Sequence, residues 1–253
     1  MELTLQMFLI VCPLVFLAGL MDAIAGGGGL ISLPAYIIAG LPPHFAIGTN
    51  KLSSAVGTSV STARYCRNKY VDWGVAIPSV ILALIGSAIG ANIALLIDEK
   101  IMKYMLVIIL PFIAVYVLRA RRMKEDQQKE TISRKKVYLI ACVASFVIGA
   151  YDGFYGPGTG SFLILIYTSL AKMDIKIASG NTKLVNLSSN IAALVTFLLN
   201  GKIIFLLGIT AAVFSIAGHY IGAGLVIKNG HKVIRPIILF VLLLLFIKVI
   251  LGK

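Results

Sequence analysis

Long apolar segments, separated by short polar links, dominate the chain. Nearly continuous apolar runs occupy residues 3–21, 73–97, 101–118, 137–151, 203–227 and 233–251. Each run is close to the roughly 20 residues with which an α-helix crosses the hydrocarbon core of a bilayer. Backbone groups inside lipid must be hydrogen-bonded within their own segment, so we expect each run to be helical. The pattern predicts an all-α polytopic membrane protein.

Two glycine-rich interruptions break this apolar pattern. The first, DAIAGGGGLISLP, begins at Asp22, and the second, DGFYGPGTGSFLI, begins at Asp152. A short apolar stretch follows each interruption, at 29–41 and at 159–171. A helix of about 13 residues reaches only about 20 Å, which is less than the hydrocarbon core of about 30 Å. We therefore expect a half-helix to begin just after each glycine break.

The two interruptions belong to a repeat that extends over the chain. Asp22 matches Asp152 at a spacing of 130 residues, and AIGTNK at 46–51 matches ASGNTK at 178–183 at a spacing of 132. Internal similarity of this kind is typical of transporters that are built from two homologous halves. It predicts three parts: a first transmembrane repeat at 1–125, a basic cytoplasmic linker at 126–136 and a second transmembrane repeat at 137–253.

The number of crossings depends on whether the short stretch of each half spans the membrane. Its length argues for a re-entrant segment and for eight crossings in all. The Lys and Arg residues of the loops gather more strongly on one face if the short stretch does cross. That asymmetry favours ten crossings, inverted halves and both termini outside the cell. The sequence thus predicts eight to ten transmembrane segments, with ten preferred.

Composition agrees with a membrane location and excludes several other classes. The chain is 59% hydrophobic and only 13% charged, whereas a soluble domain has about 25% charged residues. The net charge of +13 comes from loops, which is the positive-inside pattern and not a nucleic-acid-binding face. The three cysteines lack metal-ligand spacing, and no catalytic motif occurs. We therefore expect no nucleic acid, no metal, no cofactor and no enzymatic activity.

Four charged residues lie inside the apolar body, namely Asp22, Lys51, Asp152 and Lys183. A charge at membrane depth costs about 3 kcal/mol on insertion scales, so such residues usually pair with one another or line a polar cavity. One interpretation is an ion pair within each half, Asp22 with Lys51 and Asp152 with Lys183. The other is contact with a substrate, or uptake of protons that couples transport to a gradient, with Asp22 and Asp152 as the coupling residues.

The glycine breaks point to a small anion as the ligand. A helix that begins at such a break directs its N-terminal amides and its dipole at the space in front of it. The polar segments GTNKLSS at 48–54 and GNTKLVNLSSN at 180–190 are expected to start two more half-helices, with Thr and Asn as caps. Hydroxyl and amide groups that suit a tetrahedral oxyanion come from Ser53, Ser54, Ser188, Ser189 and Asn190. The alternative is close helix packing at the glycines and hydrogen bonding without a ligand.

The histidines carry a weaker signal. His44 and His231 fall in expected loops, whereas His219 lies within an apolar run. A lone histidine at such a position is more often a packed hydrogen-bonding residue than a ligand. We therefore expect His219 to be structural.

The motifs resemble those of a known family. DAIAGGGGLISLPAYIIAGLPPHFAIGTNKL at 22–52, YDGFYGPGTGSFLILI at 151–166 and ASGNTKLVNLSSNIAALVTF at 178–197 resemble the sulfite exporter TauE/SafE family, also called the toluene sulfonate uptake permease family. The resemblance covers nearly the whole chain. It implies a multi-pass transporter of a bacterial or archaeal inner membrane that moves sulfur-containing anions such as sulfite, sulfonates or sulfoacetate, often by export.

The resemblance also implies a substrate site. It would consist of the two glycine breaks and the two Lys-bearing segments: Gly26, Gly27, Gly28, Gly29, Thr49, Asn50, Lys51, Gly156, Gly158, Gly160, Asn181, Thr182 and Lys183. We expect a secondary transporter that acts as an exporter and works by alternating access around a midplane site between the repeats. An anion-selective channel and a membrane assembly factor without transport activity are the alternatives. The expected partners are a small anion and the lipid bilayer, and a homo-oligomer is compatible with the sequence.

Overall fold

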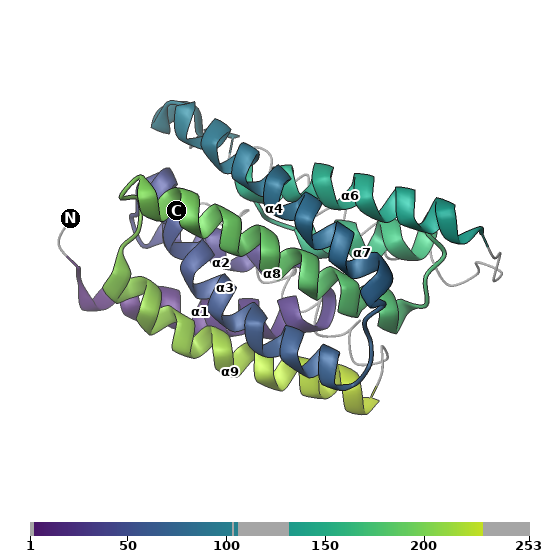
Figure 1. Cartoon of the computed structure of the whole chain (residues 1–253). Helices are drawn as coiled ribbons and strands as arrows, with labels where there is room; N and C mark the ends of the chain where they lie inside the picture. Colours follow the sequence, from purple (N-terminus) through teal and green to yellow (C-terminus); the bar gives the residue numbers. More distant parts are fainter. Residues whose placement is uncertain (1–2, 103, 106–131, 230–253) are drawn as a thin grey trace.

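The computed structural model describes residues 3–102, 104–105 and 132–229. All regular structure in these ranges is helical, and the helices pack side by side (Figure 1). The predictions for 101–118, 126–136 and 233–251 fall wholly or largely outside the described residues. The helices are α1 (Leu5–Ala25), α2 (Gly29–Ile38), α3 (Pro43–Arg67), α4 (Trp73–Leu96), α6 (Arg134–Phe154), α7 (Thr159–Ser169), α8 (Ile175–Leu199) and α9 (Phe205–Asn229).

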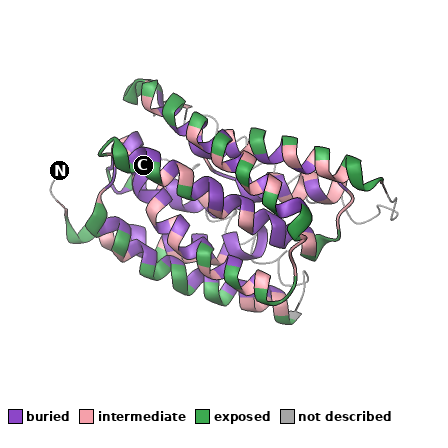
Figure 2. Ribbon diagram, in the orientation of Figure 1, coloured by how far each residue is buried: buried purple, intermediate pink, exposed green. Residues whose placement is uncertain are grey.

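Five of these helices, α1, α4, α6, α8 and α9, are long and apolar enough to cross a membrane. The outer faces of α4, α6 and α9 are largely exposed, whereas α3 and α8 run through the buried interior (Figure 2). Exposed isoleucines recur at every fourth residue of α4, as at Ile77, Ile81 and Ile85. An apolar stripe on the outer face of a helix can contact lipid tails without burying polar groups in them. The prediction of a multi-pass helical membrane protein is confirmed.

The two short helices that follow the glycine breaks are present. α2 has 10 residues and α7 has 11, so each is only about 15–17 Å long at 1.5 Å per residue. Gly26 ends α1 in the left-handed conformation, with a φ of 73°, and Gly158 precedes α7 with a φ of 86°. Glycine adopts these angles without strain, so the breaks occur where the sequence places its glycines.

The two breaks touch each other at the centre of the molecule. A Cβ atom at Gly26 would lie 2.4 Å from the carbonyl carbon of Gly160. The amide of Ser161 donates to the carbonyl of Gly26 at 2.7 Å, and the Ser161 hydroxyl donates to the carbonyl of Ala25 at 3.0 Å. The first turn of α7 thus binds the last carbonyls of α1, which have no partner within their own helix.

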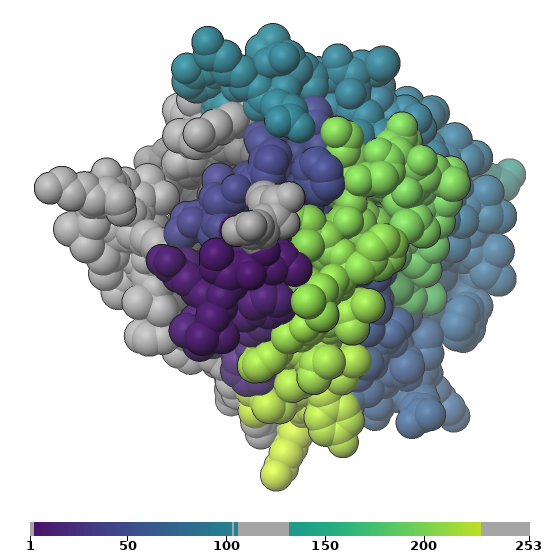
Figure 3. All heavy atoms as spheres, turned by 90° about the vertical axis from the view of Figure 1, so that its left-hand side faces the viewer, coloured from purple at the N-terminus to yellow at the C-terminus, as the bar shows by residue number. Residues whose placement is uncertain are grey.

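Helices α3 and α8 run in opposite directions. Tyr70, after the end of α3, packs against Gly180 near the start of α8, and Lys202, after the end of α8, packs against Gly48 near the start of α3. We call the two ends of the molecule the Asn68 end and the Asn200 end, after the residues that follow α3 and α8. Figure 3 looks onto the Asn200 end, where α1 and α9 lie side by side.

The prediction that two more half-helices begin at 48–54 and 180–190 is wrong. Both segments lie inside continuous 25-residue helices, α3 and α8. Their polar side chains bind neighbouring loops instead of capping a helix. The hydroxyl of Thr49 accepts from the amide of Ile204 at 3.0 Å, and the amide oxygen of Asn181 accepts from the amide of Asp72 at 3.0 Å.

Candidate functional site

A small polar cavity lies where the glycine breaks meet α3, α8 and α9. It has about 30 Å³ of space for the centres of water molecules, roughly two to three times what a single water needs. The space therefore suits water or a small ion. Most of its lining residues are glycines or carry polar side chains, and the polar ones are Asp22, Ser32, Asn50, Lys51, Ser54, Thr58, Asp152, Thr159, Asn186, Asn190, Ser215 and His219.

One wall of the cavity is a fully bonded ion pair between α3 and α6. The Lys51 ammonium lies 2.8 Å from Oδ2 of Asp152 and donates to Oδ1 of Asn190 at 3.1 Å. The Asp152 carboxylate also accepts from the hydroxyl of Thr159 at 2.8 Å and from the hydroxyl of Ser189 at 2.6 Å. Both charged side chains are almost completely buried. Because both carboxylate oxygens have short hydrogen bonds, this pair is held in one geometry.

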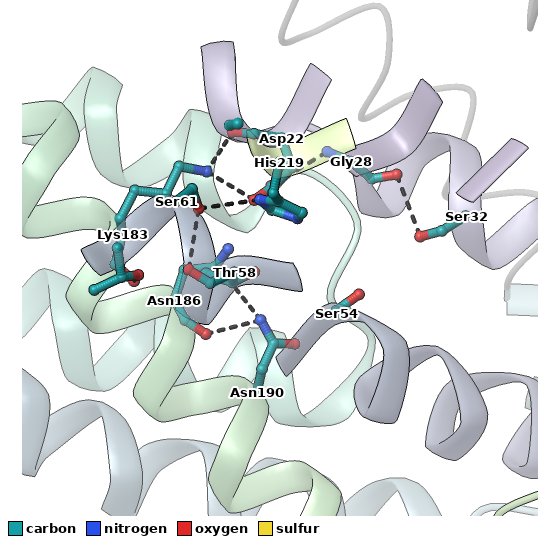
Figure 4. A network of polar contacts seen from close by, with 12 residues as sticks. Asp22, Gly28, Ser32, Ser54, Thr58, Ser61, Lys183, Asn186, Asn190 and His219 are labelled. Atoms are coloured by element: carbon teal, nitrogen blue, oxygen red, sulfur yellow. Dashed lines mark hydrogen bonds and ion pairs between the residues drawn. The ribbon is translucent and has the colours of Figure 1, made fainter. Parts of the chain in front are cut away.

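The second ion pair joins α1 and α8. The Lys183 ammonium lies 2.7 Å from Oδ2 of Asp22 and also donates to the main-chain carbonyl of Asp22 (Figure 4). The other contacts of the Asp22 carboxylate are longer. The amide of Gly28 donates to Oδ1 at 3.4 Å, and Nε2 of His219 lies 3.9 Å from Oδ2. Asp22 is therefore less completely bonded than Asp152.

The two ion pairs connect the predicted halves. The expectation of a pair within each half, Asp22 with Lys51 and Asp152 with Lys183, is wrong, because each lysine binds the aspartate of the other half. The reason is the direction of the helices. α3 and α8 run antiparallel through the centre, so each lysine reaches the end of the opposite glycine-broken helix.

The two ion pairs leave the charged side chains of the cavity electrically balanced. Each ammonium is neutralised by a carboxylate within 2.8 Å. Lys51 lines the cavity, whereas Lys183 contacts Asp22 and is not among the lining residues. Attraction for an anion must therefore come from partial charges or from a further proton.

Eight of the thirteen substrate-site residues named from the sequence line the cavity. They are Gly26, Gly28, Gly29, Asn50, Lys51, Gly156, Gly158 and Gly160, and both proposed coupling residues, Asp22 and Asp152, line it too. Gly27 packs against Met21 and Ser161. Thr182 is buried, and its hydroxyl has no hydrogen-bond partner among the described residues. The remaining three, Thr49, Asn181 and Lys183, make the contacts described above.

Sequence reasoning did not assign six polar lining residues to the site, namely Ser32, Thr58, Thr159, Asn186, Ser215 and His219. Helical periodicity was the available signal. Thr58 follows Lys51 by seven residues on α3, and Asn186 precedes Asn190 by four residues on α8, so each lies on the same helix face as a residue already singled out. Asn190 donates to the carbonyl of Asn186 at 2.8 Å (Figure 4).

The N-termini of both half-helices face the cavity. Gly29 is the first residue of α2, Gly160 is in the first turn of α7, and both line the cavity. The first amides of a helix have no partner within that helix and carry a partial positive charge of about half an elementary charge. The arrangement can therefore bind a small anion through main-chain donors.

Comparisons with known proteins point to one family. A family model described as sulfite exporter TauE/SafE matches residues 11–249. A probable membrane transporter protein of Haemophilus influenzae is 33% identical over 99% of this chain and 97% of its own length. The probable membrane transporter protein YfcA of Escherichia coli is 34% identical over 89% of this chain and 82% of its own. A probable membrane transporter of Sinorhizobium is 33% identical over 93% of this chain and 89% of its own. No solved structure matches the chain.

Proposed function

We propose that this chain, which belongs to the sulfite exporter TauE/SafE family of membrane transporters, is a secondary transporter of small sulfur oxyanions. Sulfite, sulfonates and sulfoacetate are the substrate candidates, and export is the proposed direction. The observation that carries the proposal is the buried polar cavity, which is bounded by two half-helix N-termini and two ion pairs. The main-chain amides at the two half-helix N-termini favour a small anion as the ligand.

We further propose that the protein is built from two inverted repeats. The helix lengths support this, because α1 and α6 each have 21 residues, α3 and α8 each have 25, and α2 and α7 have 10 and 11. α1 begins at the Asn200 end (Figure 1), whereas the ion pair of Arg134 with Asp72 holds the start of α6 at the Asn68 end. Opposite starting points are what inverted halves require.

Matched left-handed residues support the same proposal. A positive φ occurs at Lys69 and at Gly201, which are 132 residues apart, and at Gly40 and Lys172, also 132 apart. Asn68 and Asn200 each donate from their side-chain amides to the carbonyl four residues earlier at 2.8 Å. The same turn therefore follows α3 and α8. The parts remain those named from the sequence: a first repeat at 1–125, a linker at 126–136 and a second repeat at 137–253.

The crossed ion pairs suit an alternating-access mechanism. In such a mechanism one repeat moves against the other around a central site that opens to each side in turn. Lys51 with Asp152 and Lys183 with Asp22 join the repeats at the cavity. An anion that enters the cavity lies next to both ion pairs. Its binding can therefore change the strength of the contacts that join the repeats.

Thermal stability of the purified protein in detergent tests the anion site. We expect one sulfur oxyanion among sulfite, sulfoacetate, isethionate and thiosulfate to stabilise the protein, whereas chloride does not. A ligand at 100 times its dissociation constant adds about 2.7 kcal/mol. The shift should disappear in the Lys51→Ala/Asp152→Asn variant, which removes a buried pair without leaving one charge alone. Lys176→Ala is the control, because Lys176 is exposed on α8.

Two results would count against the proposal. Stabilisation by sodium and by none of the anions would show that the cavity is a cation site. Uptake into vesicles at a rate that rises linearly with anion concentration, without saturation, would favour an anion channel, because a channel binds its ion weakly.

A further inference from the structure

The cavity is electrically balanced before an anion enters. Its two carboxylates, Asp22 and Asp152, are matched by the ammonium groups of Lys183 and Lys51. An anion that binds there adds a net negative charge to a buried site, which is unfavourable unless a positive charge accompanies it. Histidine is the side chain that can gain a positive charge near neutral pH, and one histidine, His219, lines this cavity.

Hydrogen bonds fix the orientation of the His219 ring. Nδ1 lies 3.0 Å from the hydroxyl oxygen of Ser61, and that hydroxyl lies 3.0 Å from the carbonyl oxygen of Thr58. A carbonyl only accepts and Ser61 has one hydroxyl hydrogen, so the geometry favours Ser61 donating to Thr58 and accepting from Nδ1–H. This tautomer leaves the lone pair of Nε2 available for a proton.

Nε2 faces the least completely bonded carboxylate of the cavity. It lies 3.9 Å from Oδ2 of Asp22, which is too long for a hydrogen bond. The ring is 2% exposed, and its Cδ2 atom packs against Gly19 and Gly57, where a Cβ atom would lie within 3.0 Å. A proton on Nε2 would therefore form an imidazolium beside Asp22 and next to the cavity.

Helices α1 and α3 pack against α9, and Lys183 of α8 reaches the same region through its bond to Asp22. The ionisable side chains of this region are Asp22 of α1, Lys51, Arg64 and Tyr65 of α3, Lys183 of α8, and Tyr220 of α9 itself. Tyr65 donates to the carbonyl of Ala23, and Arg64 donates to the carbonyl of Tyr220 and covers its ring. The two lysines are paired with carboxylates. Apart from the Arg64 guanidinium, which donates to the main chain of Tyr220, the charged side chains of this region are thus paired before an anion enters.

We propose that His219 binds one proton together with each anion, so that the protein moves the anion and the proton as a neutral pair. The proton comes from bulk water and adds to the Nε2 lone pair, which changes neutral imidazole to imidazolium, and no other bond forms or breaks. The inference rests on the proposed function, because it requires an anion in the cavity. By linkage, the anion strengthens proton binding by the same factor by which the proton strengthens anion binding.

Other acceptors fit the geometry less well. A proton on Asp22 would remove the negative charge from its bond to the buried ammonium of Lys183, which is costly. Asp152 already accepts from Lys51, Thr159 and Ser189. The position that matches His219 in the first half is Ser87, whose hydroxyl donates to the carbonyl of Ser189 at 2.6 Å. One half therefore carries the proton site, which sets the stoichiometry at one proton per anion.

Isothermal titration calorimetry of the purified full-length protein tests the proposal. Isethionate is the probe, because a sulfonate stays ionised at every pH used, whereas sulfite itself titrates near neutral pH. Titrations at one pH in buffers of different ionisation enthalpy give the number of protons taken up. We expect about one proton per isethionate at pH 7.5 and a Kd that weakens about tenfold per pH unit above neutrality.

Two histidine variants assign the proton. In His219→Gln the uptake should fall to zero and the Kd should lose its pH dependence. His44→Gln is the matched control, because His44 is also buried, bonds the carbonyl of Ala94 and lies outside the cavity; it should keep the uptake of one proton. Equal melting temperatures of the variants show that both are folded.

The outcomes separate this inference from the proposed function. Isethionate binding without proton uptake in the wild type, or full uptake in His219→Gln, overturns the role of His219 and leaves the anion site standing. Absence of binding by isethionate, sulfite, sulfoacetate and thiosulfate at any pH overturns the anion site, and the role of His219 with it.

Discussion

At the scale of single residues, the main feature is that each of the two buried lysines is paired with an aspartate from a distant part of the sequence. Removing one partner of a buried ion pair leaves the other charge in a low-dielectric interior, which typically costs about 3–5 kcal/mol. The two pairs differ in what remains after such a change. Asp152 keeps the hydroxyls of Thr159 and Ser189, whereas within the described part of the chain Asp22 keeps only the amide of Gly28 at 3.4 Å and the distant ring of His219.

Lysine truncations should therefore differ in their effect. We expect Lys183→Ala to lower the free energy of unfolding by more than Lys51→Ala does, by about 1 kcal/mol, the usual worth of one hydrogen bond to a remaining charge. SDS-induced unfolding in mixed micelles measures both.

A double-mutant cycle checks the crossed pairing itself. Lys51→Ala with Asp152→Asn should show a coupling of about 1–3 kcal/mol, whereas Lys51→Ala with Asp22→Asn should be closer to additive. Stronger coupling of Lys51 with Asp22 would mean that the ion pairs form within each half.

At the scale of elements, the central feature is the contact between the two glycine breaks. α1 must stop at Gly26 so that α7 can begin against it, and a side chain at Gly26 would enter the backbone of Gly160. The half-helix termini reach the cavity because of this contact. The glycines thus permit both the left-handed backbone and the close approach.

Alanine at Gly26 should be far more damaging than alanine at Gly201. Both glycines have similar φ values, 73° and 66°, but a Cβ atom at Gly201 would meet nothing within 4 Å. The backbone strain is about 1–2 kcal/mol at each, so any larger loss at Gly26 reports the contact with α7. Thermal stability of Gly26→Ala and Gly201→Ala in detergent gives the comparison. Equal losses would show that the two breaks do not touch.

At the scale of the whole molecule, the opposite directions of α3 and α8 put equivalent turns at opposite ends. Asn68 and Asn200 follow these helices and are both exposed. Inverted repeats place the two residues on opposite sides of the membrane.

Cysteine labelling measures this arrangement. Asn68→Cys and Asn200→Cys would be introduced into a chain in which Cys12, Cys66 and Cys142 are replaced by serine. A membrane-impermeant maleimide added to intact cells should label one of the two and not the other. Lysed cells, in which both should react, provide the control. Labelling of both or of neither in intact cells would contradict inverted repeats.

The sequence by itself determined the parts whose physics is local. Continuous apolar runs require helices in lipid, and the glycines of 26–29 and 156–160 stop a helix wherever the chain forms one. The four buried charges were also evident, because a charge in an apolar run must find a partner. Helix periodicity also carried the signal for Thr58 and Asn186, which the interpretation of the sequence missed.

Tertiary structure decided what depends on direction and distance. Whether Lys51 pairs with Asp22 or with Asp152 is set by the antiparallel crossing of α3 and α8, which no local pattern encodes. The same crossing let Thr49 and Asn181 bind loops far away in the sequence, so the half-helices expected at 48–54 and 180–190 did not form. The packing of α9 on α1 and α3 places His219, which lies within an apolar run, at the wall of the cavity. Side chains that are 155 or 161 residues apart meet only when helices pack, and packing determines which buried charge is neutralised.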